Sequence, residues 1–211
     1  MADARPATET RAGLPVLAFA SAALFERWLR RQPAGSAGLW LKLAKQAAGV
    51  ASVSKQEAIE VALCHGWIDG QLKPYGHGFW LVRFTPRTAR SRWSQINRST
   101  ALRLMAVGHM APAGLAQVEA ARADGRWDGA YAPQSQAVVP PDLQQALDDN
   151  PAARDFFATL TGANRYAVLY RIQDAKTAAT RCKRIQQFTT MLARGEVVHA
   201  PRPGAVDKAG A

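Results

Sequence analysis

The chain has 211 residues, 48% of them apolar, and its 27 Lys and Arg side chains outnumber its 16 Asp and Glu, giving a formal net charge of +11. This composition allows an ordinary hydrophobic core in one or two small domains, and it excludes an intrinsically disordered chain. No apolar run approaches the roughly 18 residues of a membrane-spanning helix, and residues 1–13 lack the apolar region of a secretory signal. We therefore expect a cytoplasmic protein with no transmembrane segment, whose oligomeric state stays open.

Two cysteines, Cys64 and Cys182, lie far apart in the sequence. In a reducing cytoplasm we expect two free thiols rather than a disulfide. The four histidines are scattered and no C-x-x-C pattern occurs, so we expect neither a structural metal site nor a cofactor.

Hydrophobic periodicity and turn residues predict a mixture of strands and helices in the first two thirds of the chain. Ser21 is a candidate cap for the first helix, and Ser54 with Glu57 forms a capping-box pattern at the start of the second. Ser91 is the predicted cap of the third helix, which follows the clearest strand. The predicted elements are strands over 14–21, 39–45 and 79–87, and helices over 22–32, 55–65, 92–108 and 110–124.

A linker rich in Pro, Gly and Gln over 126–141 precedes a purely helical region. Its predicted helices cover 141–149, 151–160 and 164–195, the last as one bent helix or two. The predicted fold class is α+β, predominantly helical, with a small sheet of about three strands in the N-terminal part and a helical C-terminal part. The predicted organisation is a disordered arm (1–16), an α/β domain (17–132), a helical domain (133–198) and a disordered tail (199–211).

The stretch ALCHGWIDG, residues 62–70, gathers several residues with chemical potential. Cys64 falls at a helix C-terminus, where the helix dipole opposes a thiolate, which favours a small apolar side chain over a nucleophile. His65 is either an anion contact or general base, or a half-buried aromatic filler. Asp69 is either an acid catalyst or, as the neighbouring arginines favour, the ion-pair partner of Arg83, Arg87 or Arg90.

A second cluster, RFTPRTARSRWSQIN, surrounds the predicted start of the third helix. Arg87 beside the N–H groups of a helix start would make an anion site, and Ser91, Ser94 and Asn97 are spaced to share a helix face. The alternative is an ordinary helix cap with solvated arginines. Trp67, Trp80 and Trp93 flank the two clusters, as pocket or core walls or as stacking surfaces.

Several long motifs resemble the YdeI/OmpD-associated family, also called bacteriocin-protection proteins. They are ALCHGWIDGQ, RFTPRTARSRWSQIN, GHMAPAGLAQVEAARADGRWDGAY and the C-terminal VPPDLQQAL…FFATL…AKTAATRCKRI, and the resemblance runs from about Phe19 to Val198. It implies a bacterial protein linked to envelope stress or antimicrobial-peptide resistance, with no agreed enzymatic reaction. It also implies that the GWIDG and FTPR segments are adjacent. Position 65 is often a bulky aromatic in this motif, which argues against a required histidine base.

Three hypotheses about function follow from the residues. The first, which we favour, is a non-catalytic protein that binds a small anion or an acidic peptide. Its predicted ligand-binding residues are Trp40, His65, Trp67, Asp69, Arg87, Ser91, Trp93, Ser94 and Asn97. The second is non-specific nucleic-acid binding through two basic stretches, 73–103 and 165–184. The third is an enzyme that uses His65 and Asp69, although these residues match no reaction template.

Overall fold

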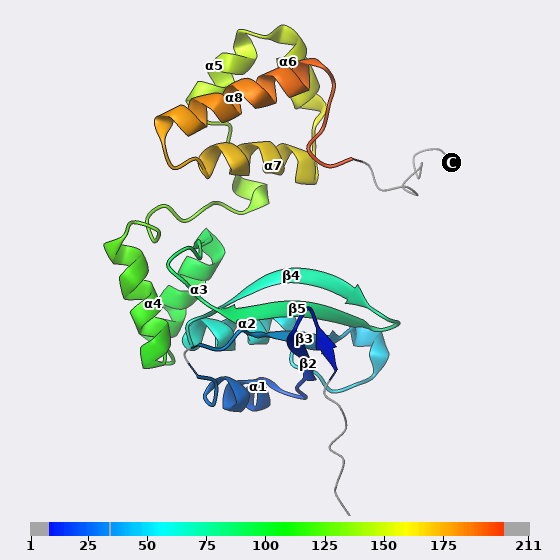
Figure 1. Ribbon diagram of the computed structural model, residues 1–211, viewed down its shortest axis with the longest axis vertical. Coiled ribbons are helices and arrows are strands. Elements are labelled where there is room, and N and C mark those ends of the chain that lie inside the picture. Colours follow the sequence, from blue (N-terminus) through cyan, green and yellow to red (C-terminus); the bar gives the residue numbers. More distant parts are fainter. Residues whose placement is uncertain (1–8, 34, 201–211) are drawn as a thin grey trace, which may run out of the picture. The chain divides into compact units, whose positions relative to one another are not determined.

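The computed structural model describes residues 9–33 and 35–200 (Figure 1). The chain divides into two compact units between Ala130 and Tyr131, inside the predicted linker. Each unit has a hydrophobic core of its own. None of the described helices combines the length and apolar character needed to cross a bilayer.

The first unit is built on a mixed five-stranded sheet with the strand order β1-β2-β3-β5-β4. β2 and β3 are parallel, and all other neighbouring strands are antiparallel. The strands are β1 (Thr10–Arg11), β2 (Leu14–Ala18), β3 (Leu39–Ala44), β4 (Trp67–Tyr75) and β5 (Phe79–Pro86).

The prediction of about three strands is wrong because β1 and β4 were missed. β4 is an edge strand whose sequence WIDGQLKPY buries only Trp67 and contains Gly and Pro, so it shows no apolar alternation. β1 has two residues and forms only through its pairing with β2. The predicted disordered arm is therefore wrong for residues 10–11 and 14–16, while its first eight residues lie outside the described part of the chain.

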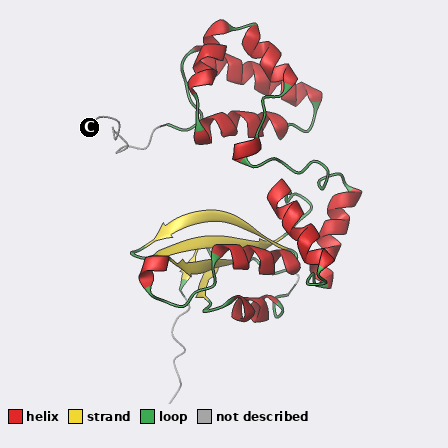
Figure 2. Ribbon diagram, turned by 180° about the vertical axis from the view of Figure 1, so that it is seen from behind, coloured by secondary structure: helices red, strands yellow, loops and turns green. Residues whose placement is uncertain are grey.

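Two helices, α1 (Ala22–Leu29) and α2 (Lys55–Cys64), cover one face of this sheet (Figures 1 and 2). Their apolar residues pack against alternate residues of β3 and β5 in the main core, which includes Phe25, Leu41 and Phe84. The predicted Ser54–Glu57 capping box is confirmed, with each side chain accepting from the backbone N–H of the other. A short 3-10 helix (Gln46–Ala48) lies between β3 and α2.

A second small core lies under α3 (Gln95–Ala106) and α4 (Pro112–Ala123), and includes Trp93 and Trp127. The cap of α3 is Ser94, whose hydroxyl accepts from the N–H of Asn97, so the prediction of Ser91 as cap is wrong. Ser91 instead closes a turn by accepting from the N–H of Thr88. Ser94 accepts from a residue three positions after it, whereas Ser91 accepts from a residue three positions before it. The local sequence does not distinguish these two roles.

The second unit is helical, with α5 (Pro141–Asp148), α6 (Pro151–Thr159), α7 (Gly162–Gln173) and α8 (Ala178–Ala193) after a 3-10 helix (Gln134–Gln136). The region predicted as one bent helix or two forms two, because Thr177 caps α8. The predicted disordered tail is wrong at its start: the backbone of His199 exchanges two hydrogen bonds with the side chain of Asn164. Residues 201–211 lie outside the described part.

Candidate ligand-binding site

A cavity of about 290 Å³ lies in the first unit, where α1 and α2 end, β4 begins, β5 ends and α4 begins. Six of the side chains that line it are polar or aromatic. They are Arg30, Gln32, His65, Trp67, Arg87 and Gln117. No Asp or Glu is among the described lining residues, so the wall of the cavity combines cationic and amide groups with apolar surface.

Backbone pairing brings the two sequence clusters to this cavity. Trp67 at the start of β4 is opposite Pro86 at the end of β5. The next residue, Arg87, donates its N–H to the carbonyl of Gly66 at 2.9 Å. The GWIDG and FTPR segments are therefore adjacent, as the resemblance implied.

Glycine is required at position 66, where φ is +76°. A Cβ at this position would lie 2.8 Å from the carbonyl oxygen of Ala113 on α4. Because L side chains rarely adopt this conformation and the contact is with backbone, any other residue would displace the chain here. Gly66 thus allows α4 to approach the end of α2 and close that side of the cavity.

Glu26 on α1 contacts two side chains of the cavity wall, Arg30 and His65. Its Oε1 accepts from Nη2 of Arg30 at 2.6 Å and lies 3.4 Å from Nε2 of His65. The hydrogen bond from Arg30, together with the weaker one involving His65, lowers the pKa of Glu26 below its ordinary value in spite of partial burial. Glu26 is consequently ionised at neutral pH and helps to orient His65, whose side chain is 11% exposed.

Arg87 is a buried arginine, only 5% exposed. Its Nη1 donates to the carbonyl oxygen of Arg92 at 3.1 Å, and its guanidinium carbon lies 3.7 Å from the ring centroid of Trp93. Stacking on an indole is a favourable environment for a desolvated guanidinium, which stays protonated at all accessible pH values. The cavity therefore has a permanent positive charge in its wall.

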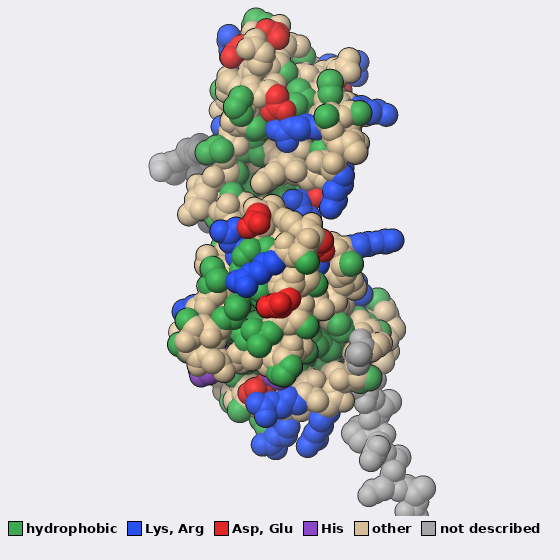
Figure 3. Space-filling model, turned by 90° about the vertical axis from the view of Figure 1, so that its left-hand side faces the viewer, with side chains coloured by type: hydrophobic (Ala, Val, Ile, Leu, Met, Phe, Trp, Pro, Cys, Tyr) green, Lys and Arg blue, Asp and Glu red, His purple; other side chains and the backbone are tan. Residues whose placement is uncertain are grey.

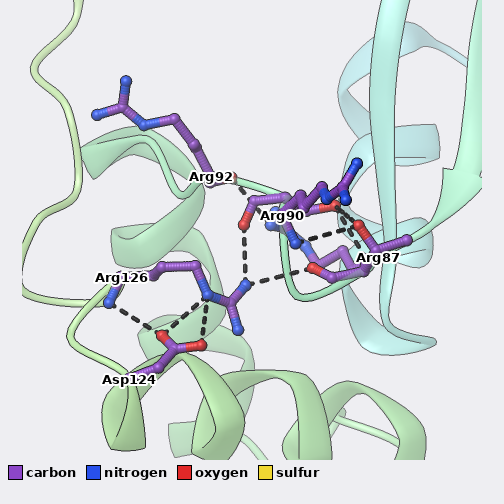
Figure 4. Close-up of polar contacts among 7 residues, drawn as sticks. Arg87, Arg90, Arg92, Asp124 and Arg126 are labelled. Atoms are coloured by element: carbon purple, nitrogen blue, oxygen red, sulfur yellow. Dashed lines mark hydrogen bonds and ion pairs between the residues drawn. The ribbon is translucent and has the colours of Figure 1, made fainter. Parts of the chain in front are cut away.

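A second arginine fixes the loop that carries Arg87 (Figure 4). Nη1 of Arg126 donates to the carbonyl oxygen of Ser91 at 2.9 Å and to that of Thr88 at 3.4 Å. Nε of Arg126 is held by Asp124 at 2.7 Å. Charge-assisted bonds to backbone carbonyls make this loop a rigid support for Arg87.

Three of the predicted ligand-binding residues, His65, Trp67 and Arg87, meet at the cavity. Trp40 does not, because it lies on the other face of the sheet, 4% exposed, with Nε1 donating to the carbonyl of Arg11. Asp69 does not line the cavity either.

The predicted ion pair of Asp69 with Arg83, Arg87 or Arg90 does not form among the described residues. Asp69 is opposite Phe84, so it lies on the helix-covered face, because directly paired residues share a face. Arg83 precedes Phe84 on β5 and therefore lies on the other face of the sheet, because successive side chains of a strand alternate between faces. Arg87 and Arg90 lie beyond the end of β5.

The residues predicted at the start of the third helix have structural contacts. Trp93 is 1% exposed and packs edge-on against Trp127. Ser94 and Asn97 form the cap of α3, and Ser91 belongs to the preceding turn. The predicted shared helix face is wrong because Ser91 lies outside the helix, and none of these four residues lines the cavity.

Sequence reasoning missed Arg30 and Gln32, which line the cavity from the end of α1, and Gln117, which lines it from α4. Nothing in the local sequence indicates that these two helices reach the same cavity. The close approach of α2 and α4 has one signal, the pair Gly66 and Gly114, both of which face backbone of the other segment.

Cys64 lines a neighbouring cavity of about 430 Å³ together with Glu26 and Glu60. Burial, followed by the negative charges of Glu26 and Glu60, raises the pKa of the Cys64 thiol. The thiol is therefore protonated at neutral pH and is a poor nucleophile. Across residues 9–33 and 35–200, no group of three or more His, Cys, Asp or Glu side chains is arranged to hold a metal ion.

Fold and cavity together define a two-unit protein with a small-molecule-sized cavity in its α/β unit. Residues 136–195 match the family model described as "Bacteriocin-protection, YdeI or OmpD-Associated". The helical second unit therefore carries the domain of the YdeI/OmpD-associated family, and the match confirms the resemblance over residues 136–195. Residues 17–117, which contain the GWIDG and FTPR motifs, match a separate model described as "Domain of unknown function (DUF8412)". No curated protein and no solved structure matches the chain.

Proposed function

We propose that the first unit binds a small organic anion, without catalysis, in the cavity lined by Arg30, His65 and Arg87. The observation that carries the proposal is the composition of this wall, in which two arginines and a histidine come from three separate segments and no Asp or Glu is among the described lining residues. A volume of about 290 Å³ is at the lower end of the range for small-molecule sites. It suits a metabolite-sized acid.

The charge around the cavity favours an anion. Arg27, Arg30 and Arg31 are exposed on α1 and just after it, and Figure 3 shows basic side chains gathered at the lower edge of the first unit, where α1 lies. An acidic side chain lies beside this basic group, and elsewhere on that face acidic and basic side chains are mixed. Because Arg87 is already desolvated, an anion entering the cavity gains attraction at a low further cost of dehydration.

The remaining wall suits an apolar group beside the acid. Trp67 and Leu29 present apolar surface, and the amides of Gln32 and Gln117 supply donors and acceptors for orientation. Sites of this kind use apolar walls for affinity and a few polar groups for specificity. The ligand class is thus a carboxylate or phosphate ester that carries a small ring or branched apolar group.

Binding is favoured over catalysis because His65 and Asp69 do not share the cavity. His65 faces Glu26 at 3.4 Å, and Asp69 is absent from the described lining. An acid–base pair requires both groups within hydrogen-bonding reach of one substrate.

The test is titration with benzoate and phenyl phosphate, with benzyl alcohol as the neutral comparison. All six tryptophans precede Tyr131, so quenching or thermal shifts of tryptophan fluorescence report on the first unit alone. The variant is Arg30→Gln, and the matched control is Arg27→Gln, which removes the same charge from the same helix outside the cavity wall.

We expect at least one anion to bind and benzyl alcohol not to bind. Loss of a charge-assisted contact corresponds to about 1.5–3 kcal/mol, so Arg30→Gln should raise Kd by about tenfold or more, and Arg27→Gln by less than about twofold. Equal effects of the two substitutions, or binding of the alcohol as tight as that of the acids, would contradict the proposal.

We also propose that this binding serves envelope stress or antimicrobial-peptide resistance; the family description of the second unit supports the proposal only by naming bacteriocin protection. Susceptibility of a host lacking the gene is the measurement. The wild-type gene should restore resistance and the Arg30→Gln gene should not. If both genes restore resistance equally, ligand binding in the cavity has no part in that role.

A further inference from the structure

The sheet of the first unit has a second face, which α1 and α2 do not cover. Its buried residues, Leu14, Val16, Trp40 and Leu81, form a small cluster to which only strand residues contribute, with Tyr75 packed beside them. Figures 1 and 2 show α1 and α2 together on the opposite side. The other side chains on this face of the sheet, which surround the cluster, therefore lie at the surface of the first unit.

These side chains are basic and aromatic. Cross-strand pairing places Lys42 and Lys73 opposite Leu81, and Arg83 opposite Trp40, so all three share the face of the cluster. Arg11 lies over Trp40, 5.5 Å from its ring centroid. We call this surface the cationic sheet face, and it consists of Arg11, Lys42, Lys73, Tyr75, Phe79 and Arg83.

Two half-buried rings lie among the cations. The ammonium of Lys42 is 4.3 Å from the ring centroid of Phe79 and 5.0 Å from that of Tyr75. The carboxylate of Glu9 accepts from the Tyr75 hydroxyl at 2.6 Å. Asp69, the acidic residue within β4, lies on the opposite face, so cations outnumber acids on the cationic sheet face.

Among its basic residues, this surface shares only Lys73 and Arg83 with the basic stretches visible in the sequence. Several arginines of the first stretch are held within the unit: Arg98 donates to the carbonyl of Trp127 at 3.2 Å, and Arg103 pairs with Glu60 at 2.7 Å. In the second stretch, Arg181 pairs with Asp142 at 2.5 Å. Strand pairing thus creates the concentrated basic surface by adding Arg11 and Lys42 to two residues of the first stretch.

We propose that the cationic sheet face binds a single-stranded nucleic acid. Exposed Arg11, Lys73 and Arg83 contact phosphates, and unpaired bases stack on Phe79 and Tyr75. An incoming base displaces the Lys42 ammonium from the rings toward a neighbouring phosphate. Basic grooves with accessible rings favour single strands, because a duplex keeps the π-faces of its bases stacked on each other.

The experiment measures anisotropy of labelled oligothymidylate, oligouridylate and a duplex of equal length with the full chain over a salt series. The charge variant is Lys73→Gln with Arg83→Gln, two exposed positions on the cationic sheet face. The matched control is Lys183→Gln with Arg194→Gln, two exposed positions in the second unit. The ring variant is Phe79→Leu, which keeps apolar packing and removes the stacking surface.

We expect the charge variant to lower the slope of log K against log salt by about 1.4, since each single-strand phosphate contact contributes about 0.7. The control should leave the slope unchanged. Phe79→Leu should weaken single-strand binding about tenfold at constant salt without changing the slope. Binding of either the DNA or the RNA single strand supports the proposal, and the two arms show which sugar is preferred.

The proposal is overturned if the control lowers the slope as much as the charge variant, or if the duplex binds as tightly as the single strands. It is also overturned if Phe79→Leu folds normally and binds unchanged, because attraction would then be purely electrostatic. The charge variant alone still tests the surface should Phe79→Leu prove unstable. Benzoate should not compete with the oligonucleotides, since the small-anion cavity is a separate site.

Discussion

The close approach of α2 and α4 makes Gly114→Ala a sensitive test of the structure. Gly114 is buried in the first turn of α4. A Cβ at this position would lie 2.3 Å from the carbonyl oxygen of Cys64 and 2.8 Å from that of Leu63. Both atoms belong to backbone, so no side-chain rotation relieves the overlap, and α4 must move away from the end of α2.

Two opposing effects determine the change in the free energy of unfolding. In an open helix, replacing Gly by Ala stabilises by about 1 kcal/mol. Overpacking a tight contact destabilises by about 1–3 kcal/mol, and a backbone–backbone overlap belongs at the upper end. The expected net effect is therefore a loss of about 2 kcal/mol, opposite in sign to the helix-propensity expectation.

Urea unfolding followed by tryptophan fluorescence measures this loss in the first unit, because all six tryptophans lie there. Gly35→Ala is the matched control: a Cβ at Gly35 meets nothing within 4 Å and its φ is not in the left-handed region. Since that substitution only restricts the unfolded chain, it should be neutral or stabilising by up to about 1 kcal/mol.

Gly114→Ala should also weaken anion binding, because Ala113 and Gln117 of α4 line the cavity. A stabilising or neutral effect of Gly114→Ala would refute the close packing of α2 and α4. It would also contradict the inference that Gly66 and Gly114 shape the cavity by allowing α2 and α4 to approach closely.

Three further outcomes are expected. Ser94→Ala should destabilise the first unit by about 1 kcal/mol, as loss of a helix cap does, and Ser91→Ala by less, both measured by urea unfolding. The side chain of Arg181 on α8 holds the pKa of Asp142 below its ordinary value. The pair therefore stabilises the fold fully at pH values above the pKa that Asp142 has in the unfolded chain. This contribution is lost as the pH falls through the lower pKa of Asp142 in the folded protein. Asp142→Asn should therefore reduce stability at neutral pH by at most about 1 kcal/mol, because the pair is exposed, with a difference that vanishes in acid, measured by circular dichroism. Iodoacetamide should label exposed Cys182 much faster than Cys64, as followed by mass spectrometry.

For each of these predictions, one result would contradict the reasoning. A larger loss for Ser91→Ala than for Ser94→Ala would move the start of α3. A stability difference for Asp142→Asn that grows in acid would reverse the sign of the pKa shift. Equal labelling of the two cysteines would show that the Cys64 thiol is neither buried nor electrostatically disfavoured as a thiolate.

Local sequence signals predicted the elements whose formation depends on neighbouring residues. The capping box at Ser54, the Ser21 cap of α1 and the strand β5 each depend on residues within a few positions, and each matches the structure. β4 was missed because an edge strand needs apolar alternation only where it is buried, and beyond Trp67 it is largely exposed.

The candidate site was predicted in part. His65, Trp67 and Arg87 were identified as residue types suited to a pocket, and pairing of β4 with β5 brings them together. Trp40 does not line the cavity because strand alternation puts it on the other face of the sheet. Asp69 does not line it either, although it lies on the same face as Trp67. Which face a residue occupies depends on the register, which becomes fixed only when the strands pair.

The sequence by itself determined the α+β class, the family of the second unit, most helix starts and the strongly basic charge, because these depend on composition and on contacts between near neighbours. Only the tertiary structure decided which arginines are held by internal partners and which ones gather on the cationic sheet face. It also decided that α1 and α4 complete the cavity. The physical reason is that sheet pairing and helix packing join positions that lie tens of residues apart, and no local pattern encodes those distances.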